Sequence, residues 1–98
     1  MANKSELVSF LDRRVFGPIL KASSSGRSEH EKGELEDVQR RTRTEQDRYH
    51  HYESAEKVVE MYKDDLSSAK AREVNAKLQR LKLPILADVK EEFLKMAG

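Results

Sequence analysis

The residues of this chain best suited to metal chemistry lie in the stretch RTRTEQDRYHHYE, residues 41–53. Neutral imidazole is a common metal ligand, and helical metal sites usually place two histidines at i and i+4 on one face. His50 and His51 are adjacent, so on a helix they point about 100° apart and share no face. Asp47 and His51 have the required spacing, but they supply two ligands where zinc sites use three or four protein ligands. Weak metal binding at 47–51 is therefore the third of three functional hypotheses.

Nucleophilic catalysis requires a nucleophile beside a base, an orienting acid and donors for the developing oxyanion. Ser54 follows His50 by one helical turn, but no Gly-rich elbow or oxyanion-hole sequence accompanies it. The four glycines are scattered and form no phosphate-cradling loop. The chain also contains no cysteine, which removes thiolate chemistry. We therefore predict that this protein is not an enzyme and carries no cofactor.

Two basic clusters could contact nucleic-acid phosphates. The first, residues 40–48, is interleaved with carboxylates, as expected for a solvated, salt-bridged helix. The second, residues 70–82, contains one acid, Glu73, and the following bases: Lys70, Arg72, Lys77, Arg80 and Lys82. Phosphate contacts need cations gathered on one face, usually within a strongly basic domain, whereas the net charge here is +1. Nucleic-acid binding through the second cluster is therefore the alternative hypothesis.

One long helical run must position most of these residues. Residues 34–82 contain neither proline nor glycine. Acid-first pairs at i,i+4, such as Glu36 with Arg40, each stabilise a helix by about 0.2–0.5 kcal/mol. The apolar residues of the run follow one heptad line, which is interrupted by a single polar residue, Glu45. Because a strong coiled coil would not place a glutamate in its seam, this pattern indicates a charged helix with a half-apolar face.

The apolar pattern of this run changes direction near its middle. The first stripe ends at Leu66, and a second begins at Ala71, rotated by about a quarter turn on a continuous helix. The slip falls on DDLSSAK, residues 64–70, where Asp and Ser favour turns and caps over helix interiors. We predict a bend in this stretch, with a helix break at 64–68.

The N-terminal segment predicts a second apolar helix. Its apolar residues recur at spacings of three and four, and Asn3 with Glu6 has the spacing of a capping box. Proline lacks an N–H group and crowds the preceding turn, so we expect this helix to kink or restart at Gly17–Pro18.

Two connections separate the predicted helices. The Ser/Gly-rich stretch 23–33 indicates a loop, because Gly33 weakens a helix that begins earlier at Ser28. Pro84 ends the long run in a turn at 82–87. A last helix is expected to begin at Asp88, which has capping-box spacing to Glu91.

These elements predict an all-α fold, because no segment shows the alternating pattern of a strand. We expect a small bundle of three to four helical segments in a single domain, residues 1–98. No apolar run approaches the ~20 residues that span a bilayer, and the N-terminus lacks the apolar core of a signal peptide. The expected protein is soluble and cytoplasmic, with no membrane span.

The favoured function is protein–protein interaction or a structural role. Charged residues make up 38% of the chain and hydrophobic ones 37%, so we expect a modest core that a partner completes. That partner would be a second copy, forming a homodimer, or another helical protein; no small-molecule substrate is expected. The candidate contact residues lie along the middle segment, where their faces either complete the core or meet the partner: Val38, Tyr49, Tyr52, Val59, Tyr62 and Leu66.

Overall fold

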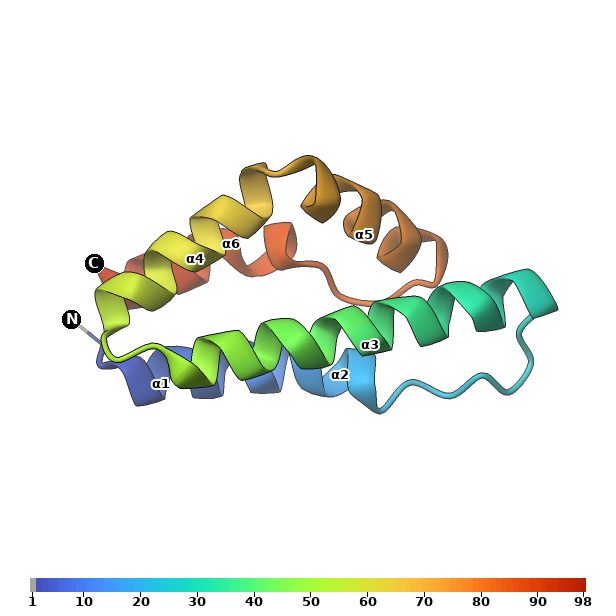
Figure 1. Cartoon of the computed structure of the whole chain (residues 1–98), viewed down its shortest axis with the longest axis horizontal. Coiled ribbons are helices and arrows are strands. Elements are labelled where there is room, and N and C mark those ends of the chain that lie inside the picture. Colours follow the sequence, from blue (N-terminus) through green and yellow to red (C-terminus); the bar gives the residue numbers. More distant parts are fainter. Residues whose placement is uncertain (1) are drawn as a thin grey trace.

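The computed structural model describes residues 2–98 as a bundle of helices (Figure 1). No strand occurs among these residues, so the predicted all-α fold class is confirmed. The elements in chain order are α1 (Lys4–Leu11), the π-helical stretch η1 (Asp12–Phe16), α2 (Gly17–Leu20), α3 (Glu29–His51), α4 (Ala55–Ser67), α5 (Ala69–Arg80) and α6 (Leu86–Ala97).

In the first helical segment the α-helix is interrupted just before the Gly17–Pro18 pair, where we expected a kink or a restart, and it resumes at Gly17. In η1 the helix widens by one residue, and the Gly17 N–H donates to the Asp12 carbonyl. Pro18 has no N–H group to donate, so one helical hydrogen bond is missing here, and the wider π turn accommodates this gap. Gly17 permits it, because a Cβ at this position would lie 2.6 Å from the Asp12 carbonyl oxygen. The pair therefore produces a bulge within one continuous helical segment.

Helix α3 begins earlier than the predicted loop 23–33 allowed. Ser28 and Glu31 form a reciprocal capping box, with each backbone N–H donating to the other side chain at 3.2 Å. The capping box satisfies two free N–H groups at the helix start, which outweighs the helix-weakening effect of Gly33. The loop is correspondingly shorter than predicted.

The middle segment forms three helices. Its second break falls at Ser68, inside the predicted bend at 64–70, and the Ser68 hydroxyl caps α5 by accepting from the Ala71 N–H at 3.1 Å. Its first break, at 52–54, was not predicted. There the Ser54 hydroxyl caps α4 by accepting from the Lys57 N–H at 3.3 Å. Both breaks thus depend on a serine N-cap, a residue type that favours this position.

The last helix also begins earlier than expected. Helix α6 starts at Leu86, within the predicted turn at 82–87, and Asp88 lies in its first turn. The Asp88 carboxylate accepts from the Ile85 N–H at 3.4 Å, so Asp88 caps the helix from inside. The chain reverses just before, where Lys82 has a φ of 59°, in the left-handed region.

The helices are arranged as a long base with an arch above it (Figure 1). Helix α3 runs antiparallel to the α1–α2 segment, and α4 and α5 rise and descend over them, with the Ser68 break at the top. Helix α6 packs against α4 and α1. The two ends of the chain meet, as the Ala2 N–H donates to the Met96 carbonyl at 2.9 Å.

Aromatic side chains from different helices meet in the core. The Tyr62 and Phe93 ring centroids lie 4.3 Å apart, and the Phe16 ring stacks on Tyr49 at 5.6 Å. Among residues 2–98, every Leu, Ile, Val, Phe and Tyr side chain is buried or half-buried. One copy therefore buries its large apolar side chains without a partner. None of the helices in this range is both long and apolar enough to cross a membrane.

Candidate functional site

The predicted partner-binding residues lie mostly inside the bundle. Val38, Tyr49 and Tyr62 are fully buried. Tyr52, Val59 and Leu66 are half-buried and pack against the same core. The reason is the break at 52–54: the stripe that a continuous helix would present on one face is divided between two helices that fold around one core.

The predicted nucleic-acid residues on α5 are divided between ion pairs and the surface. Lys77 donates to Asp37 at 2.7 Å, and Arg80 donates to Glu34 at 2.6 Å. The remaining three are exposed: Lys70, Arg72 and Lys82. Two of the five cations therefore fasten α5 to α3, which reduces the charge that this stretch offers to a phosphate backbone.

The histidine stretch does not assemble a metal site among residues 2–98, where no group of three His, Cys, Asp or Glu side chains has suitable geometry. Asp47, His50 and His51 are all exposed at the end of α3. The His50 imidazole lies 3.3 Å from the carboxylate of Asp12, so it faces the first helical segment and not Asp47.

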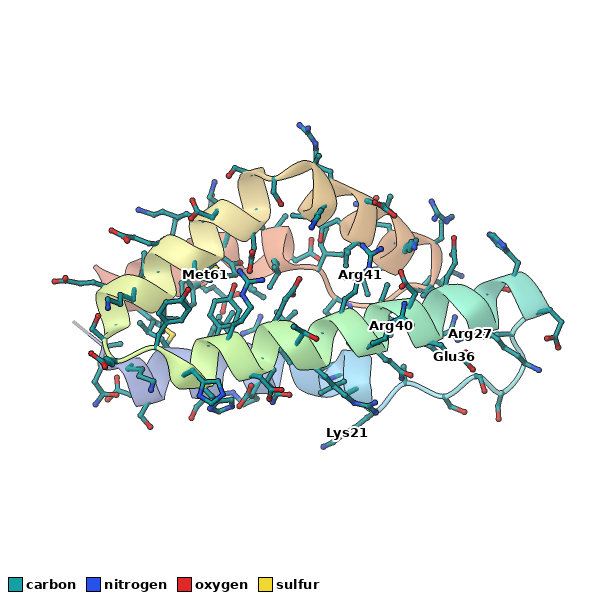
Figure 2. All side chains as sticks on the ribbon, viewed as in Figure 1. Lys21, Arg27, Glu36, Arg40, Arg41 and Met61 are labelled. Carbon is teal, nitrogen blue, oxygen red and sulfur yellow. The ribbon has the colours of Figure 1, made fainter. Side chains whose placement is uncertain are left out.

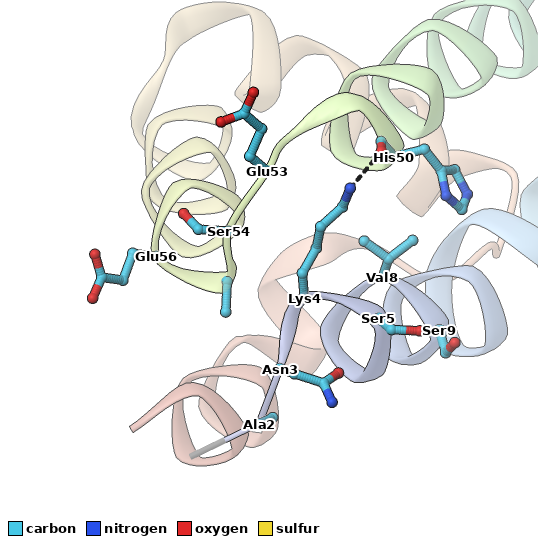
Figure 3. Close-up of a pocket in the computed structure, with 11 residues that line it drawn as sticks. Ala2, Asn3, Lys4, Ser5, Val8, Ser9, His50, Glu53, Ser54 and Glu56 are labelled. Carbon is cyan, nitrogen blue, oxygen red and sulfur yellow. Dashed lines mark hydrogen bonds between the residues drawn. The ribbon is translucent and has the colours of Figure 1, made fainter.

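Beside this stretch, a wide hollow separates the starts of α1 and α4 (Figure 3). Its volume is about 920 Å³, and the Lys4 ammonium within it donates to the His50 carbonyl at 2.7 Å. Glu53 and Glu56 also line the hollow. The one cation that Figure 3 labels at this site is therefore already engaged by a helix C-terminus, which such a charge stabilises.

At the N-terminal half of α3, carboxylates and cations match one another. Asp37 is bonded by both Arg40 and Lys77 at 2.7 Å, and Arg41 lies 3.8 Å from Glu73 on α5. In Figure 2 the Arg41 side chain lies between α3 and α5. We call the pairs Glu34–Arg80 and Asp37–Lys77 the ion-paired end.

The ion pairs shift the acidity of both carboxyls in the same direction. The hydrogen bonds from Arg80 hold the pKa of Glu34 below its ordinary value, although burial opposes this effect. The hydrogen bond from Lys77, with the nearby Arg41 charge, likewise lowers the pKa of Asp37. Both carboxylates are therefore stably charged near neutral pH.

Farther along the same face of α3, the space between α3 and the arch opens into a cavity of about 320 Å³. We call it the Glu45 cleft. Its walls come from the first helical segment, α3, α4, α5 and α6. The apolar lining consists of Val15, Phe16, Ile19, Ala71, Val74, Leu78 and Leu86, and the polar lining includes Thr42, Glu45, Arg48, Asp65, Lys70 and Asn75.

Asp65 is already bonded inside the cleft. The buried Tyr49 hydroxyl donates to one Asp65 oxygen at 2.7 Å, and Arg48 lies 3.5 Å from the other. Burial and the nearby Asp65 charge raise the pKa of the Tyr49 phenol, so it stays protonated and remains a donor. The negative charge of Asp65 is therefore fixed in place by two neighbours.

Glu45, in contrast, makes no hydrogen bond or ion pair with any side chain among residues 2–98. Burial, followed by repulsion from Asp65, raises its pKa to about 7, although Arg48 and Arg41 act in the opposite direction. A carboxyl with this pKa exists in both protonation states near neutrality. It can accept hydrogen bonds and pair with a cation when ionised, or donate a hydrogen bond when protonated.

The sequence contained one signal for this site, the interruption of the apolar heptad line at Glu45. We used it as evidence against a coiled coil and did not include Glu45 among the candidate site residues. A lone polar residue in a buried stripe either finds a partner inside the fold or marks a site. Which of these holds depends on the helices that face it.

No protein-family model, no curated protein and no solved structure matches this chain.

Proposed function

We propose that this protein binds a small ligand in the Glu45 cleft and does so without catalysis. The observation that carries this proposal is a half-buried carboxyl, without a hydrogen-bond or ion-pair partner among residues 2–98, in a partly open hollow with an apolar lining. Small-molecule sites are typically concave and mostly apolar, about 300–1,000 Å³ in volume, with a few polar groups that orient the ligand. The cleft, at about 320 Å³, lies at the lower end of that range.

Binding without chemistry is supported by the polar groups in the cleft. The hydroxyl that donates to a carboxylate there belongs to Tyr49, and its raised pKa disfavours the phenolate that would act as a nucleophile. The Ser68 hydroxyl donates to the Asp65 backbone carbonyl instead, at 3.4 Å. Neither arrangement activates a nucleophile beside a base.

The proposal is tested by titrating the protein with benzylamine and benzyl alcohol and following the amide resonances by two-dimensional NMR. We expect saturable shifts at Thr42, Ala71 and Asn75, which line the cleft. The variant Ala71→Leu should fill the cleft and abolish these shifts. Ala55→Leu is the matched control, since Ala55 lines two other hollows.

If Ala71→Leu still shows the same saturable shifts, the cleft is not the binding site. Saturable shifts around Ala55 in place of those in the cleft would also overturn the assignment. Circular dichroism of both variants establishes that each retains the helical fold, so that loss of binding reports on the cleft itself. Failure of both probes to saturate would also reject the proposal.

We propose self-association through α4 as a second function, because part of the predicted interaction face remains accessible. Val59 lines a shallow hollow with Ala55, Leu94 and Ala97 on α4 and α6. If two copies of α4 pair antiparallel across Val59, Glu56 of one copy lies opposite Lys63 of the other, twice by symmetry. This charge complementarity favours a second copy as the partner.

Light scattering after size exclusion, across a tenfold range of concentration, tests self-association. We expect the molar mass to rise with concentration, and to return to that of a monomer in Lys63→Glu. The double variant Glu56→Lys with Lys63→Glu should restore association. A concentration-independent monomer would remove α4 as an interface.

A further inference from the structure

We propose that the ligand of the Glu45 cleft is an organic cation, an amine with an apolar body whose ammonium group pairs with the Glu45 carboxylate. This inference rests on the proposed ligand-binding function. It goes further by assigning the charge and the chemical class of the ligand.

The first step of the argument is that the cleft holds a free acceptor. Both oxygens of Asp65 are engaged by Tyr49 and Arg48, whereas Glu45 has no bonded partner among residues 2–98. Glu45 is half-buried, so its carboxylate is only partly hydrated, and a cation that reaches it replaces the hydration that burial removes. A ligand ammonium would therefore stabilise the ionised form of Glu45.

The second step concerns the charged groups that surround Glu45. Helix α3 contributes Arg41 and Arg48, which are directed to Glu73 and Asp65 respectively. Helix α4 adds Asp64 and Asp65, and α5 adds Lys70. Glu73 of α5 lines an adjoining hollow that shares Glu45 and Lys70 with the cleft. The first helical segment and α6 contribute only apolar side chains.

Among these groups, the positive charges are engaged or exposed. Arg48 is held by Asp65, Arg41 lies near Asp37 and Glu73, and Lys70 is exposed. Three carboxylates line the cleft (Glu45, Asp64 and Asp65) against two cations (Arg48 and Lys70), so the lining carries a net negative charge. That is the charge arrangement that recognises a cation.

The third step is the apolar part of the cleft lining. Ala71 is half-buried and Val74 is 9% exposed, so they offer accessible apolar surface, while Phe16, Ile19 and Leu78 line the cleft but are almost fully buried. An aryl or alkyl group placed against this lining leaves water at about 25 cal/mol per Å² of apolar area buried. A simple metal ion or ammonium ion would leave this lining unused, so the complementary ligand has both a charge and an apolar body.

Binding of such a cation must be linked to the proton on Glu45. Because the pKa of Glu45 is about 7, protons compete with the ligand below that pH. From pH 6 to pH 8 the ionised fraction rises about tenfold, and the affinity for a permanently charged amine should rise by about the same factor.

The experiment measures dissociation constants for benzylamine, benzyl alcohol and benzoate at pH 6 and pH 8 by NMR titration. We expect benzylamine to bind most tightly, with an affinity about tenfold higher at pH 8. Glu45→Gln should reduce this affinity to that of benzyl alcohol and remove the dependence on pH. The matched control Glu73→Gln, which removes a carboxylate from the adjoining hollow, should keep the pH dependence.

The outcomes separate the two proposals. Equal binding of benzyl alcohol at both pH values would overturn the cationic class while the cleft remains the binding site. Tighter binding of benzoate would also overturn it and would point to Lys70. Absence of saturable binding by all three probes would reject the cleft as a ligand site, and the inference with it.

Discussion

Glu34 and Glu45 are the same residue type on the same helix, yet they have opposite environments. Eleven residues make about three helical turns, so both lie on the face of α3 that meets the arch. Glu34 receives three charge-assisted bonds from Arg80, and its pKa is lowered. Glu45 receives none, and its pKa is raised to about 7. The difference comes from the facing helices, since the residue itself is identical.

The break at Ser68 explains why the facing helices differ. The second half of α5 descends onto the N-terminal half of α3 and places Lys77 and Arg80 beside Asp37 and Glu34. Glu45 instead shares its cleft with the Ser68 break, and the nearby charge from α4 is the acidic Asp65. One break in the middle segment thus separates a closed, ion-paired end from an open cleft.

The largest effect that would test this contrast is expected for Glu45→Gln. The folded-state pKa of Glu45, about 7, lies above its ordinary value of 4.5, so the folded protein holds the extra proton more tightly. The contribution of Glu45 to the free energy of unfolding is therefore fully present below pH 4.5, and it is lost as the pH rises to about 7. The total loss should approach about 3 kcal/mol. Urea denaturation at pH 5 and pH 8 should show that Glu45→Gln removes this loss.

Glu53→Gln is the control for titration of the other carboxyl groups, because it changes an exposed residue outside the cleft. It should leave the fall in stability between pH 5 and pH 8 intact. If Glu45→Gln and Glu53→Gln show the same fall in stability between pH 5 and pH 8, burial does not raise the free energy of the Glu45 carboxylate.

An intermediate effect is expected for Tyr49→Phe, which tests whether the two carboxylates inside the cleft differ. The change removes the donor to Asp65 and leaves the ring that stacks on Phe16. Loss of a partner by a largely buried polar group typically costs about 1–3 kcal/mol. Thermal or urea unfolding at pH 7 measures the cost. A fully stable Tyr49→Phe variant would contradict the hydrogen bond between Tyr49 and Asp65.

The smallest effect is expected at the ion-paired end, for Arg80→Gln. The lowered pKa of Glu34 means that its pairing stabilises the fold above the ordinary carboxyl pKa of 4.5, and that this stability is lost as the pH falls through the lowered value. The Arg80 side chain is 55% exposed, so water and salt screen the pair. Arg80→Gln should therefore destabilise slightly at pH 7, and the difference should vanish in acid and shrink in 1 M salt.

If Arg80→Gln became more destabilising in acid, the pH dependence would have the opposite sign to that expected for the Glu34–Arg80 pair. Arg72→Gln is a suitable control, because Arg72 is an exposed cation on the same helix. It should produce no comparable dependence of stability on pH.

Much of the fold could be predicted from local chemistry. The all-α class followed from helical spacing, and the bend near Ser68 followed from a cluster of Asp and Ser that favours caps. The capping box of Ser28 and Glu31 was also visible, but we gave the local cost of Gly33 more weight. The break at 52–54 has only Ser54 as a local signal. Its position depends on how α4 folds back over α1, which is a property of tertiary packing.

The site was harder to predict, because it depends on which residues face each other across the arch. Val38, Tyr49 and Tyr62 have the spacing of an exposed face, but they pack in the core once the middle segment divides. Arg80 and Lys77 resemble free cations in the sequence until α5 meets α3. Glu45 stood out only as a polar interruption, and the cleft around it requires five elements to converge.

The most direct test of this account is the pKa of the Glu45 carboxyl, measured by NMR from the pH dependence of its side-chain carboxyl ¹³C shift, with Glu45→Gln to assign the resonance. The account predicts a midpoint of about 7, well above the other glutamates. A midpoint near the ordinary value of 4.5 would mean that Glu45 is solvated or paired. That result would contradict an unpaired carboxyl in the cleft and remove the basis for a cationic ligand.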